Sequence, residues 1–517
     1  MSENKKKALF GSAVLLVALA LINKGLGFVK SMIIASVFGA NLQTDAYYVA
    51  DGLMQNALIP ITDAVAVSFL PIYLNIKEKS RQEAKAFTSR TITDIFLLAF
   101  VLSGVLYLAA PLIMKIMLPS YTVEALNLAV SYFRILIWGM CFYMSNQLLQ
   151  SLLNAEKQYG YSSFTAMLNN LILTGAVVAL GRHFGLWAMA AAVPFSYLAQ
   201  YLFLQIKSRK YGCLTVKYGF RDSRIKKMCI CALPVFFGNA ISELNQLVDK
   251  SLLSGMEAGS VTAVSYASVL YQFASNLIIL PMTTIIYTEL AESFAADQKA
   301  EGVEKLEKGI HISMFFAIPL TFFVAIAADL VVQITYGRGA FDAQAVAMTA
   351  QGLRYYGLCF FAYCINALMA RACYSLGDTM LPMKIGIGSV SLNIVLSITL
   401  SRYMGLRGVV LATAIANILS SSLALIIFNR TKLKIHLRHF LRPGVTVLGG
   451  SVIGMICCMS WIKWCPIANG IFVFITAACI HFGIYALIVI LGRDEMAWEL
   501  LSIIKDMLWQ RHGEGEA

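Results

Sequence analysis

Long apolar segments separated by short polar loops run along almost the whole chain. A transmembrane helix needs about 20 predominantly apolar residues, because the hydrocarbon core of a bilayer is about 30 Å thick. Fourteen segments meet this requirement, and the pattern predicts an all-α polytopic membrane protein. The segments lie near residues 8–37, 45–74, 91–117, 123–153, 161–181, 186–206, 228–250, 260–291, 309–334, 347–376, 381–401, 406–429, 443–463 and 468–492.

The composition supports this class of protein. Of the 517 residues, 59% are hydrophobic and only 13% are charged, and the mean hydropathy is +0.71. A soluble domain would carry about 25% charged residues. The net charge of +13 does not indicate a nucleic-acid partner, because the positive residues lie in short loops between apolar segments. The 11 cysteines are scattered, mostly within apolar segments. The pairs Cys457-Cys458 and Cys229-x-Cys231 lack metal-ligand partners, which favours a packing role.

The distribution of Lys and Arg predicts the orientation in the membrane. With a cytoplasmic N-terminus, the inner loops and ends hold 29 of the 41 Lys and Arg residues, and the outer loops hold 7. Cytoplasmic loops carry an excess of positive residues, so we expect both termini in the cytoplasm. The run Lys5–Lys7 precedes an apolar stretch, as in a secretory signal, but no convincing small-residue cleavage site follows. We therefore predict an uncleaved first helix.

Corresponding residues recur 220 positions apart. Arg134 matches Arg354, and Gly185 matches Gly405. Six helices is an even number, so the two halves share one topology and are expected to surround a central cavity at their interface. The predicted regions are an N-lobe (1–206), a cytoplasmic basic linker (207–227), a C-lobe (228–429), two extra helices (430–492) and a cytoplasmic amphipathic tail (493–517).

Four charged residues lie in the first two apolar segments, namely Lys24, Lys30, Asp45 and Asp51. A charged side chain near the bilayer centre costs about 2.5–3.5 kcal/mol on insertion scales, so such residues usually face a bundle interior or a water-filled cavity. One interpretation is that the lysines snorkel or pair with the aspartates. The other is a cationic cavity for an anionic substrate.

The spacing of the two lysines limits how they act together. Six residues along a helix span about 9 Å, and the two side-chain directions differ by roughly 120°. The lysines therefore share one wall only if the helix bends at Gly25 and Gly27.

The segment Asn23–Lys30, followed by Phe38-Gly39-Ala40 and Asp45-Ala46-Tyr47, resembles the opening of the MurJ (MviN) family. Members of that family are bacterial flippases for lipid II, within the multidrug/oligosaccharidyl-lipid/polysaccharide exporter superfamily. The resemblance covers about residues 8–430 and is carried by the order and spacing of many short matches. Further matches are Asn245–Asp249, Tyr266-Ala267, Tyr336–Phe341, Leu353-Arg354, Asp378-Thr379, Pro382, Asn393 and Gly405-Leu406.

The resemblance implies that Lys24 and Lys30 bind the substrate, with Asp45 and Asp51 organising them. The family usually has arginine at both lysine positions, and further arginines where this chain has Val269 and, in the second helix, near Asn56–Ile59. Arginine binds a phosphate bidentately, whereas lysine offers a point charge. Three arginines within helices are candidates to compensate, although pairing in the structure explains them equally well: Arg134, Arg354 and Arg371.

The resemblance also implies a sodium site. The matching residues are Asp249, Asn393, Ser397 and Thr413, with Ser397 at a position where an acid would strengthen the site. Oxygen ligands suit a hard cation. The alternatives are ordinary hydrogen bonding between helices for the polar residues, and pairing with Lys250 at the outer face for the acid.

The two extra helices invite two interpretations. In the family they form a groove suited to a long lipid tail, whereas their weakly polar sequence alone favours lipid-exposed packing.

No sequence motif for an enzyme is present. The chain lacks a phosphate-binding loop, an HExxH motif and a paired-cysteine metal site. Its histidines (His183, His311, His436, His439, His481 and His512) are dispersed in loops or near helix ends. We expect no cofactor, and transport driven by Na⁺, by the membrane potential or by consumption of the product.

The predicted function is a flippase that moves lipid II from the inner to the outer leaflet of the bacterial cytoplasmic membrane by alternating access. The expected partners are the membrane and an anionic glycan on undecaprenyl pyrophosphate, without nucleic acid. One alternative is a flippase for another undecaprenyl-linked glycan of a teichoic acid, capsule or exopolysaccharide. A cation-coupled drug exporter resembling the MATE transporters would favour an acidic cavity. A membrane scaffold that binds an enzyme through residues 75–90 or the tail would not need charges deep in its helices.

Overall fold

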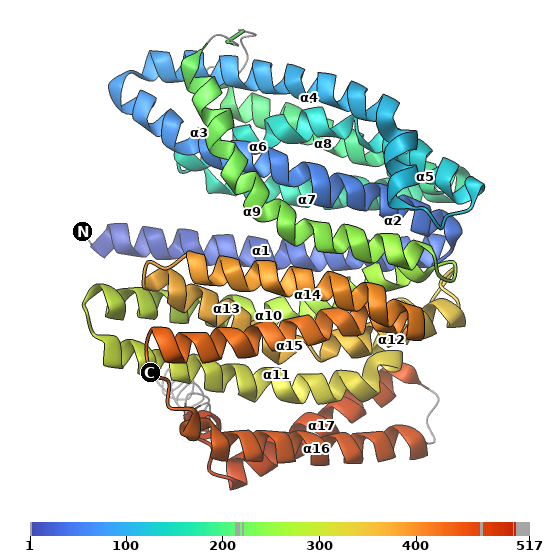
Figure 1. The fold of residues 1–517 in the computed structure, drawn as a ribbon, viewed down its shortest axis with the longest axis vertical. Coiled ribbons are helices and arrows are strands. Elements are labelled where there is room, and N and C mark those ends of the chain that lie inside the picture. Colours follow the sequence, from blue (N-terminus) through green and yellow to red (C-terminus); the bar gives the residue numbers. More distant parts are fainter. Residues whose placement is uncertain (1–2, 212–217, 220–221, 466–468, 500, 503–517) are drawn as a thin grey trace, which may run out of the picture. The chain divides into compact units, whose positions relative to one another are not determined.

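The computed structural model describes residues 3–211, 218–219, 222–465, 469–499 and 501–502 (Figure 1). Each of the predicted apolar segments falls on a helix or on a pair of consecutive helices, and the fold is an all-α membrane fold. The predicted basic linker lies outside the described residues at 212–217 and 220–221, and most of the predicted amphipathic tail lies outside them as well.

The first part of the chain, up to Ser254, forms a series of helices. They are α1 (Glu3–Phe38), α2 (Leu42–Leu53), the π-helical segment η1 (Met54–Leu58), α3 (Ile59–Lys79), α4 (Arg81–Met117), α5 (Val123–Leu136), α6 (Gly139–Ala155), α7 (Tyr159–Phe184), α8 (Leu186–Ser208), the 3₁₀ turn η2 (Arg209–Tyr211) and α9 (Ser223–Ser254).

The remaining helices follow after a short loop. They are α10 (Ser260–Ala295), α11 (Lys299–Thr335), α12 (Ala343–Gly357), α13 (Phe360–Ser375), α14 (Met380–Met404), α15 (Leu406–Thr431), the 3₁₀ turn η3 (Leu437–Phe440), α16 (Leu441–Trp464) and α17 (Gly470–Leu491).

Within the described residues, nine helices are long and apolar enough to span a membrane, where α2, η1 and α3 count as one. Two further spans come from the bent pairs α5–α6 and α12–α13, with bends of 42° and 46°. The remaining predicted spans correspond to α1, α9 and α10. The chain is therefore a multi-pass membrane protein, and the count of fourteen spans stays a prediction.

The internal repeat is confirmed by the backbone. The two bent pairs begin 220 residues apart, at Val123 and Ala343. Gly185 and Gly405, at the turns into α8 and α15, both have φ of 58°, a left-handed conformation that glycine adopts without steric cost. The turns after α6 and α13 repeat in the same way, with φ of 60° at Lys157 and 74° at Gly377.

By packing, the chain forms two compact units. Unit 1 comprises Met1–Ser265 and Arg338–Ala345, and unit 2 comprises Tyr266–Gly337 and Val346–Ala517. In unit 1, α3 packs on α4, α6 and α9, while α1 packs on α7. In unit 2, α14 pairs with α15, and α11 packs on α13, α16 and α17. Unit 1 thus includes α9, whereas the lobes predicted from the repeat divide the chain before it; those lobe boundaries stay a prediction.

The short segment of unit 1 after α11 binds the end of α1 by close backbone contact. The amide of Ala340 donates to the carbonyl of Ser36 at 2.8 Å. A Cβ atom on Gly339 would overlap that same carbonyl, and one on Gly39 would overlap the carbonyl of Ala340. Only glycine permits this approach, because it has no Cβ. The glycines that the sequence shows at these positions are therefore packing requirements.

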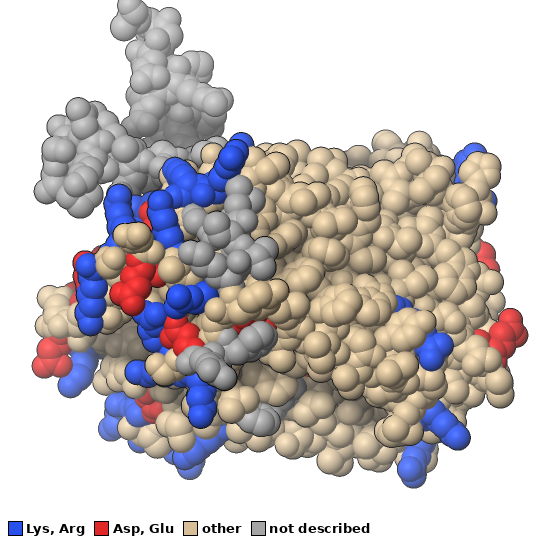
Figure 2. All heavy atoms as spheres, turned by 90° about the horizontal axis from the view of Figure 1, so that it is seen from above, with Lys and Arg blue, Asp and Glu red and all other residues tan. Residues whose placement is uncertain are grey.

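Charged side chains avoid the middle of the face shown in Figure 2. Lys and Arg gather mostly at one end of that face, and a broad uncharged region separates them from fewer charges at the other end. This arrangement is what a bilayer requires, because its core excludes unpaired charge.

A proline inside α11 explains how the two extra helices attach to unit 2. Pro319 has no amide hydrogen, so the carbonyl of Phe315 loses its partner within the helix. The hydroxyl of Tyr485 on α17 donates to that carbonyl at 2.7 Å. One turn away, His481 Nε2 lies 2.9 Å from the carbonyl of Pro319. On α16, Gly454 lies against His481, where a Cβ would come 2.7 Å from the backbone carbonyl.

We predict that Tyr485→Phe destabilises unit 2 by about 1–3 kcal/mol, because the carbonyl of Phe315 loses the hydroxyl that replaces the missing amide of Pro319. The measurement is the unfolding temperature of the purified protein in detergent. Tyr403→Phe is the matched control, since Tyr403 is 84% exposed. Equal unfolding temperatures for the two variants would contradict this explanation of the attachment.

Candidate functional site

The two lysines of α1 lie in different surroundings. Helix α1 continues without interruption through Gly25 and Gly27. Lys24 is exposed, whereas Lys30 is half-buried. Their separation on the helix surface follows from the six-residue spacing, which turns the second side chain by roughly 120°.

The side of α1 between the lysines is covered by α7. Asn23 Nδ2 donates to the carbonyl of Ser163 at 3.0 Å. A Cβ on Gly27 would lie 3.9 Å from Asn170 Nδ2, so this part of α1 packs closely on α7. Around a Cβ on Gly25, by contrast, no atom lies within 4 Å apart from those of the adjacent residues and of the α1 backbone. The exposed Lys24 therefore has open space beside it.

Asp51 on α2 attracts two cations. Both Lys30 on α1 and Lys250 on α9 are close enough for favourable Coulombic interaction with its carboxylate, and Gln55 interacts with it through a side-chain hydrogen bond. The attraction between this carboxylate and the two ammonium groups offsets part of the free-energy cost of removing the three charges from water.

Lys250 is a site residue that the sequence analysis missed, because it places this lysine at the outer end of its helix beside Asp249. In the structure its ammonium group turns to α2 and donates to the carbonyl of Tyr48 at 3.2 Å. A Cβ on Gly52 would overlap Nζ of Lys250. The available sequence signal is Gly52 directly after an intramembrane aspartate, together with Glu243 seven residues before Lys250 on the same face of α9.

The contact between α2, η1 and α9 continues as a line of polar side chains. Asn56 Nδ2 lies 3.5 Å from Gln246 Oε1, and Gln246 Nε2 donates to Glu243 Oε2 at 2.9 Å. We call Lys30, Asp51, Asn56, Glu243, Gln246 and Lys250 the polar seam. It contains two cations and two acids, so its formal charges balance. Asn56 stands near where the family resemblance leads one to expect an arginine, and its contact with Gln246 is part of this balance.

The carboxylate of Asp45 caps the N-terminus of α10. It accepts hydrogen bonds from the amides of Gly259 and Thr262 at 2.7 and 2.8 Å, and from the hydroxyl of Thr262 at 2.6 Å. These donors belong to the first turn of α10, where free amides and the helix dipole favour a negative charge. The structure thus shows a capping contact for Asp45, and its predicted role beside the lysines stays a prediction.

The candidate cation ligands divide between the units. In unit 2, Asn393 Nδ2 donates to Thr413 Oγ1 at 3.0 Å, and Ser397 Oγ donates to Asn393 Oδ1 at 3.2 Å. These bonds tie α14 to α15 in the manner of polar contacts between membrane helices. Asp249 belongs to unit 1. The structure brings three of the four residues together, and the cation site stays a prediction.

Two of the arginines within helices make equivalent contacts in the two halves. Arg134 Nε donates to the carbonyl of Tyr107 at 3.3 Å, and Arg354 Nε donates to the carbonyl of Ala325 at 3.2 Å. Arg134 also lies over the ring of Tyr107, and Arg354 pairs with Asp329. Arg134 therefore links α5 to α4, and Arg354 links α12 to α11. Arg371 lies partly buried on α13.

The fold and these charges define a class of protein, a multi-pass membrane transporter built from an internal repeat. Among solved structures, "Lipid II flippase MurJ, inward closed conformation" matches with a TM-score of 0.80 and 21% identity, covering 93% of this chain and all of that one. An inward-facing multidrug resistance MATE family transporter of the MOP superfamily matches with a TM-score of 0.64 and 14% identity, covering 80% and 94%. At these identities, the likeness establishes the fold.

The family follows from the sequence comparisons. The model of the family described as "Lipid II flippase MurJ" matches residues 34–477, and the chain belongs to this family. The probable lipid II flippase MurJ of Rickettsia prowazekii is 25% identical over 418 residues, which are 79% of this chain and 81% of that protein. The lipid II flippase MurJ of Burkholderia cenocepacia is 23% identical over 428 residues, covering 80% and 83%.

We predict that Lys250→Met destabilises the protein by about 3–5 kcal/mol, because it leaves Asp51 with less compensating charge. Adding Asp51→Asn should recover part of that loss, with a coupling energy of about 0.5–3 kcal/mol in a double-mutant cycle. Thermal unfolding in detergent measures all four proteins, and Lys115→Met, at an exposed position of α4, is the control. Strictly additive losses would show that the two charges do not interact.

We also predict that Asp45→Ala lowers the stability by about 1–3 kcal/mol, since three hydrogen bonds to a carboxylate are lost at the start of α10. Asp45→Asn should cost less, because it retains one acceptor oxygen. Glu124→Ala, which removes an exposed acid from the first turn of α5, serves as the control in the same unfolding assay. An Asp45→Ala protein as stable as this control would show that the cap contributes nothing.

Proposed function

We propose that this chain is a flippase that moves lipid II from the inner to the outer leaflet of the bacterial cytoplasmic membrane. The observation that carries the proposal is the exposed Lys24 beside open space, one and a half turns from the half-buried Lys30, in a chain of the MurJ family. A pyrophosphate cannot cross bare hydrocarbon, because it would lose its hydration. Lysines within a membrane-length helix offer that charge a substitute partner.

The two lysines have different tasks in this proposal. Lys24 is the first cation that the sugar-pyrophosphate head group meets. Lys30 is already attracted by Asp51, so a substrate anion would share it with that carboxylate and would be held less tightly there. Partial compensation of this kind suits transport, because a head group held by every available charge would be slow to leave.

Several finer features belong to the same proposal. Both termini lie in the cytoplasm, and the two repeat halves alternate access to a central cavity. The lipid-linked glycan is carried on undecaprenyl pyrophosphate, and its isoprenoid chain stays in the bilayer. The protein is a transporter without enzymatic activity. The direction of transport comes from coupling to Na⁺, bound by Asp249 together with Asn393, Ser397 and Thr413, or from coupling to the membrane potential.

The test is conditional depletion in the native host, followed by mass spectrometry of lipid-linked precursors with leaflet-specific labelling. We expect lipid II to build up on the inner leaflet. Complementation with Lys24→Ala should restore less than about a tenth of the flux, because one contact with the transported charge is lost, whereas Lys24→Arg should restore most of it. Lys115→Ala is the control, and all variants are checked for equal amounts in the membrane.

Full restoration by Lys24→Ala would contradict the role of this lysine. Accumulation of another undecaprenyl-linked glycan would support the second candidate, a flippase of a different polymer pathway. Asn56 favours that candidate, since it stands near a position where the family usually has an arginine and is engaged with Gln246. A head-group site with fewer arginines fixes a pyrophosphate less rigidly.

A further inference from the structure

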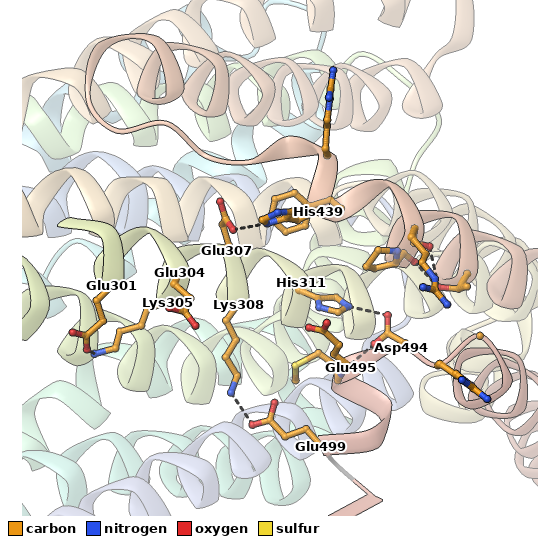
Figure 3. Close-up of a pocket in the computed structure, with 18 residues that line it drawn as sticks. Glu301, Glu304, Lys305, Glu307, Lys308, His311, His439, Asp494, Glu495 and Glu499 are labelled. Carbon is orange, nitrogen blue, oxygen red and sulfur yellow. Dashed lines mark hydrogen bonds and ion pairs between the residues drawn. The ribbon is translucent and has the colours of Figure 1, made fainter. Parts of the chain in front are cut away.

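A polar pocket of about 990 Å³ lies in unit 2, among α11, η3, α16 and the residues that follow α17 (Figure 3). Its lining residues in the described part of the chain all belong to these elements, and several of its charges are already paired. Lys308 binds Glu499 at 2.7 Å, and His311 Nε2 lies 2.9 Å from Asp494. The polar seam has no part in it, because the seam belongs to unit 1.

At the edge of this pocket, one carboxylate faces two histidines. Glu307 on α11 lies with Oε1 3.1 Å from His436 Nδ1 and with Oε2 3.2 Å from His439 Nδ1. The backbone amide of His436 also donates to Glu307 at 2.6 Å, which fixes the carboxylate in place. Figure 3 shows Glu307 and His439 turned toward each other.

The local sequence explains why the histidines converge. His436 immediately precedes η3, and His439 lies within it, three residues later. Residues three apart eclipse each other on a 3₁₀ helix, which has three residues per turn. The two rings accordingly stack, with centroids 5.1 Å apart and planes inclined by 26°.

The exposure of the rings is informative. The side chains of His436 and His439 are 65% and 67% exposed, yet both present Nδ1 to the same acid. A surface histidine gains little from a fixed orientation, because water satisfies its ring nitrogens equally well. Two histidines and a carboxylate in one place are the ligand types that a divalent transition metal prefers.

We propose that Glu307, His436 and His439 form a divalent metal site, with Zn²⁺ as the matching ion. One ligand atom from each residue lies within 4.8 Å of the other two. The two contacts of Glu307 with the histidines, 3.1 and 3.2 Å long, use different carboxylate oxygens. Bonds of about 2.0–2.2 Å in a tetrahedron place ligands about 3.3–3.6 Å apart, so the ligand atoms would close by at most about 1.5 Å on binding. The fourth position remains for water. Binding replaces the two histidine–carboxylate contacts and releases any proton on either Nδ1.

The site would fasten the beginning of α11 to the connection between α15 and α16. Helices α16 and α17 pack on α11 through a cluster that includes Phe315, Val447 and Tyr485. A metal bound at Glu307 would therefore cross-link α11 to the segment between α15 and α16. Its binding free energy would add to the free energy of unfolding of unit 2. The inference does not depend on the transported substrate.

The experiment uses the full chain, purified in detergent with its affinity tag removed and stripped by a chelator. Zn²⁺ binding is measured by calorimetry and elemental analysis, and Co²⁺ spectra report the coordination. We expect one Zn²⁺ per chain, a Zn²⁺-dependent rise in unfolding temperature, and an affinity at least about tenfold weaker in Glu307→Gln, His436→Gln and His439→Gln.

Two control variants distinguish Zn²⁺ binding at this site from nonspecific Zn²⁺ binding. His183→Gln removes an exposed histidine on α7, and Glu304→Gln removes an exposed acid of the same pocket, one turn before Glu307. Both should bind Zn²⁺ as the unmodified protein does. Absence of stoichiometric binding, or equal weakening by the control variants, would overturn the proposal. So would stabilisation by Zn²⁺ that persists unchanged in His439→Gln, which alters a side chain that is 67% exposed.

Discussion

The compensation of charge inside unit 1 is the constraint on which the rest of the site depends. Membrane-length helices cannot retain lysines and acids unless these groups find partners or water. Asp51 interacts favourably with both Lys30 and Lys250, and α9 packs on α2 so closely that the end of the Lys250 side chain occupies the space where a Cβ on residue 52 would lie. Gln246 of α9 contacts Asn56 of η1 and also binds Glu243 along the same line. Lys24 lies outside this arrangement and is exposed, so it is free of the polar seam and accessible to a substrate.

Backbone contacts, rather than further charges, set the geometry around this site. The carboxylate of Asp45 caps α10, and Ala340 binds the end of α1 through the carbonyl of Ser36. In unit 2, Tyr485 supplies the donor that Pro319 cannot. In each case a group freed by a helix end or a proline finds a specific partner far away in the sequence. Such contacts are costly to lose in a membrane, because lipid provides no alternative hydrogen bonds.

The sequence predicts most of the fold, because helix length and hydropathy are local properties. The offset of 220 residues likewise predicts repeated turns, and Gly185 and Gly405 share one conformation. The lysines of α1 are visible as charges in an apolar segment. Lys250 could not be predicted, because its surroundings depend on a contact with Gly52, about two hundred residues away. The same holds for Glu307 with His436, and for the cap that Asp45 provides. Contacts between residues so far apart in the sequence can be identified only once the chain is folded.

Native mass spectrometry of the purified protein with added lipid II measures how Lys24 contributes to binding of the head group, without requiring transport. We expect a complex with one lipid II that is at least about tenfold weaker in Lys24→Ala, since the exposed α1 cation proposed to meet the head group is gone. Lys115→Ala should bind as the unmodified protein does, and an undecaprenol without phosphate should bind equally weakly to all three. Equal affinity of lipid II for the Lys24→Ala and Lys115→Ala proteins would contradict the account.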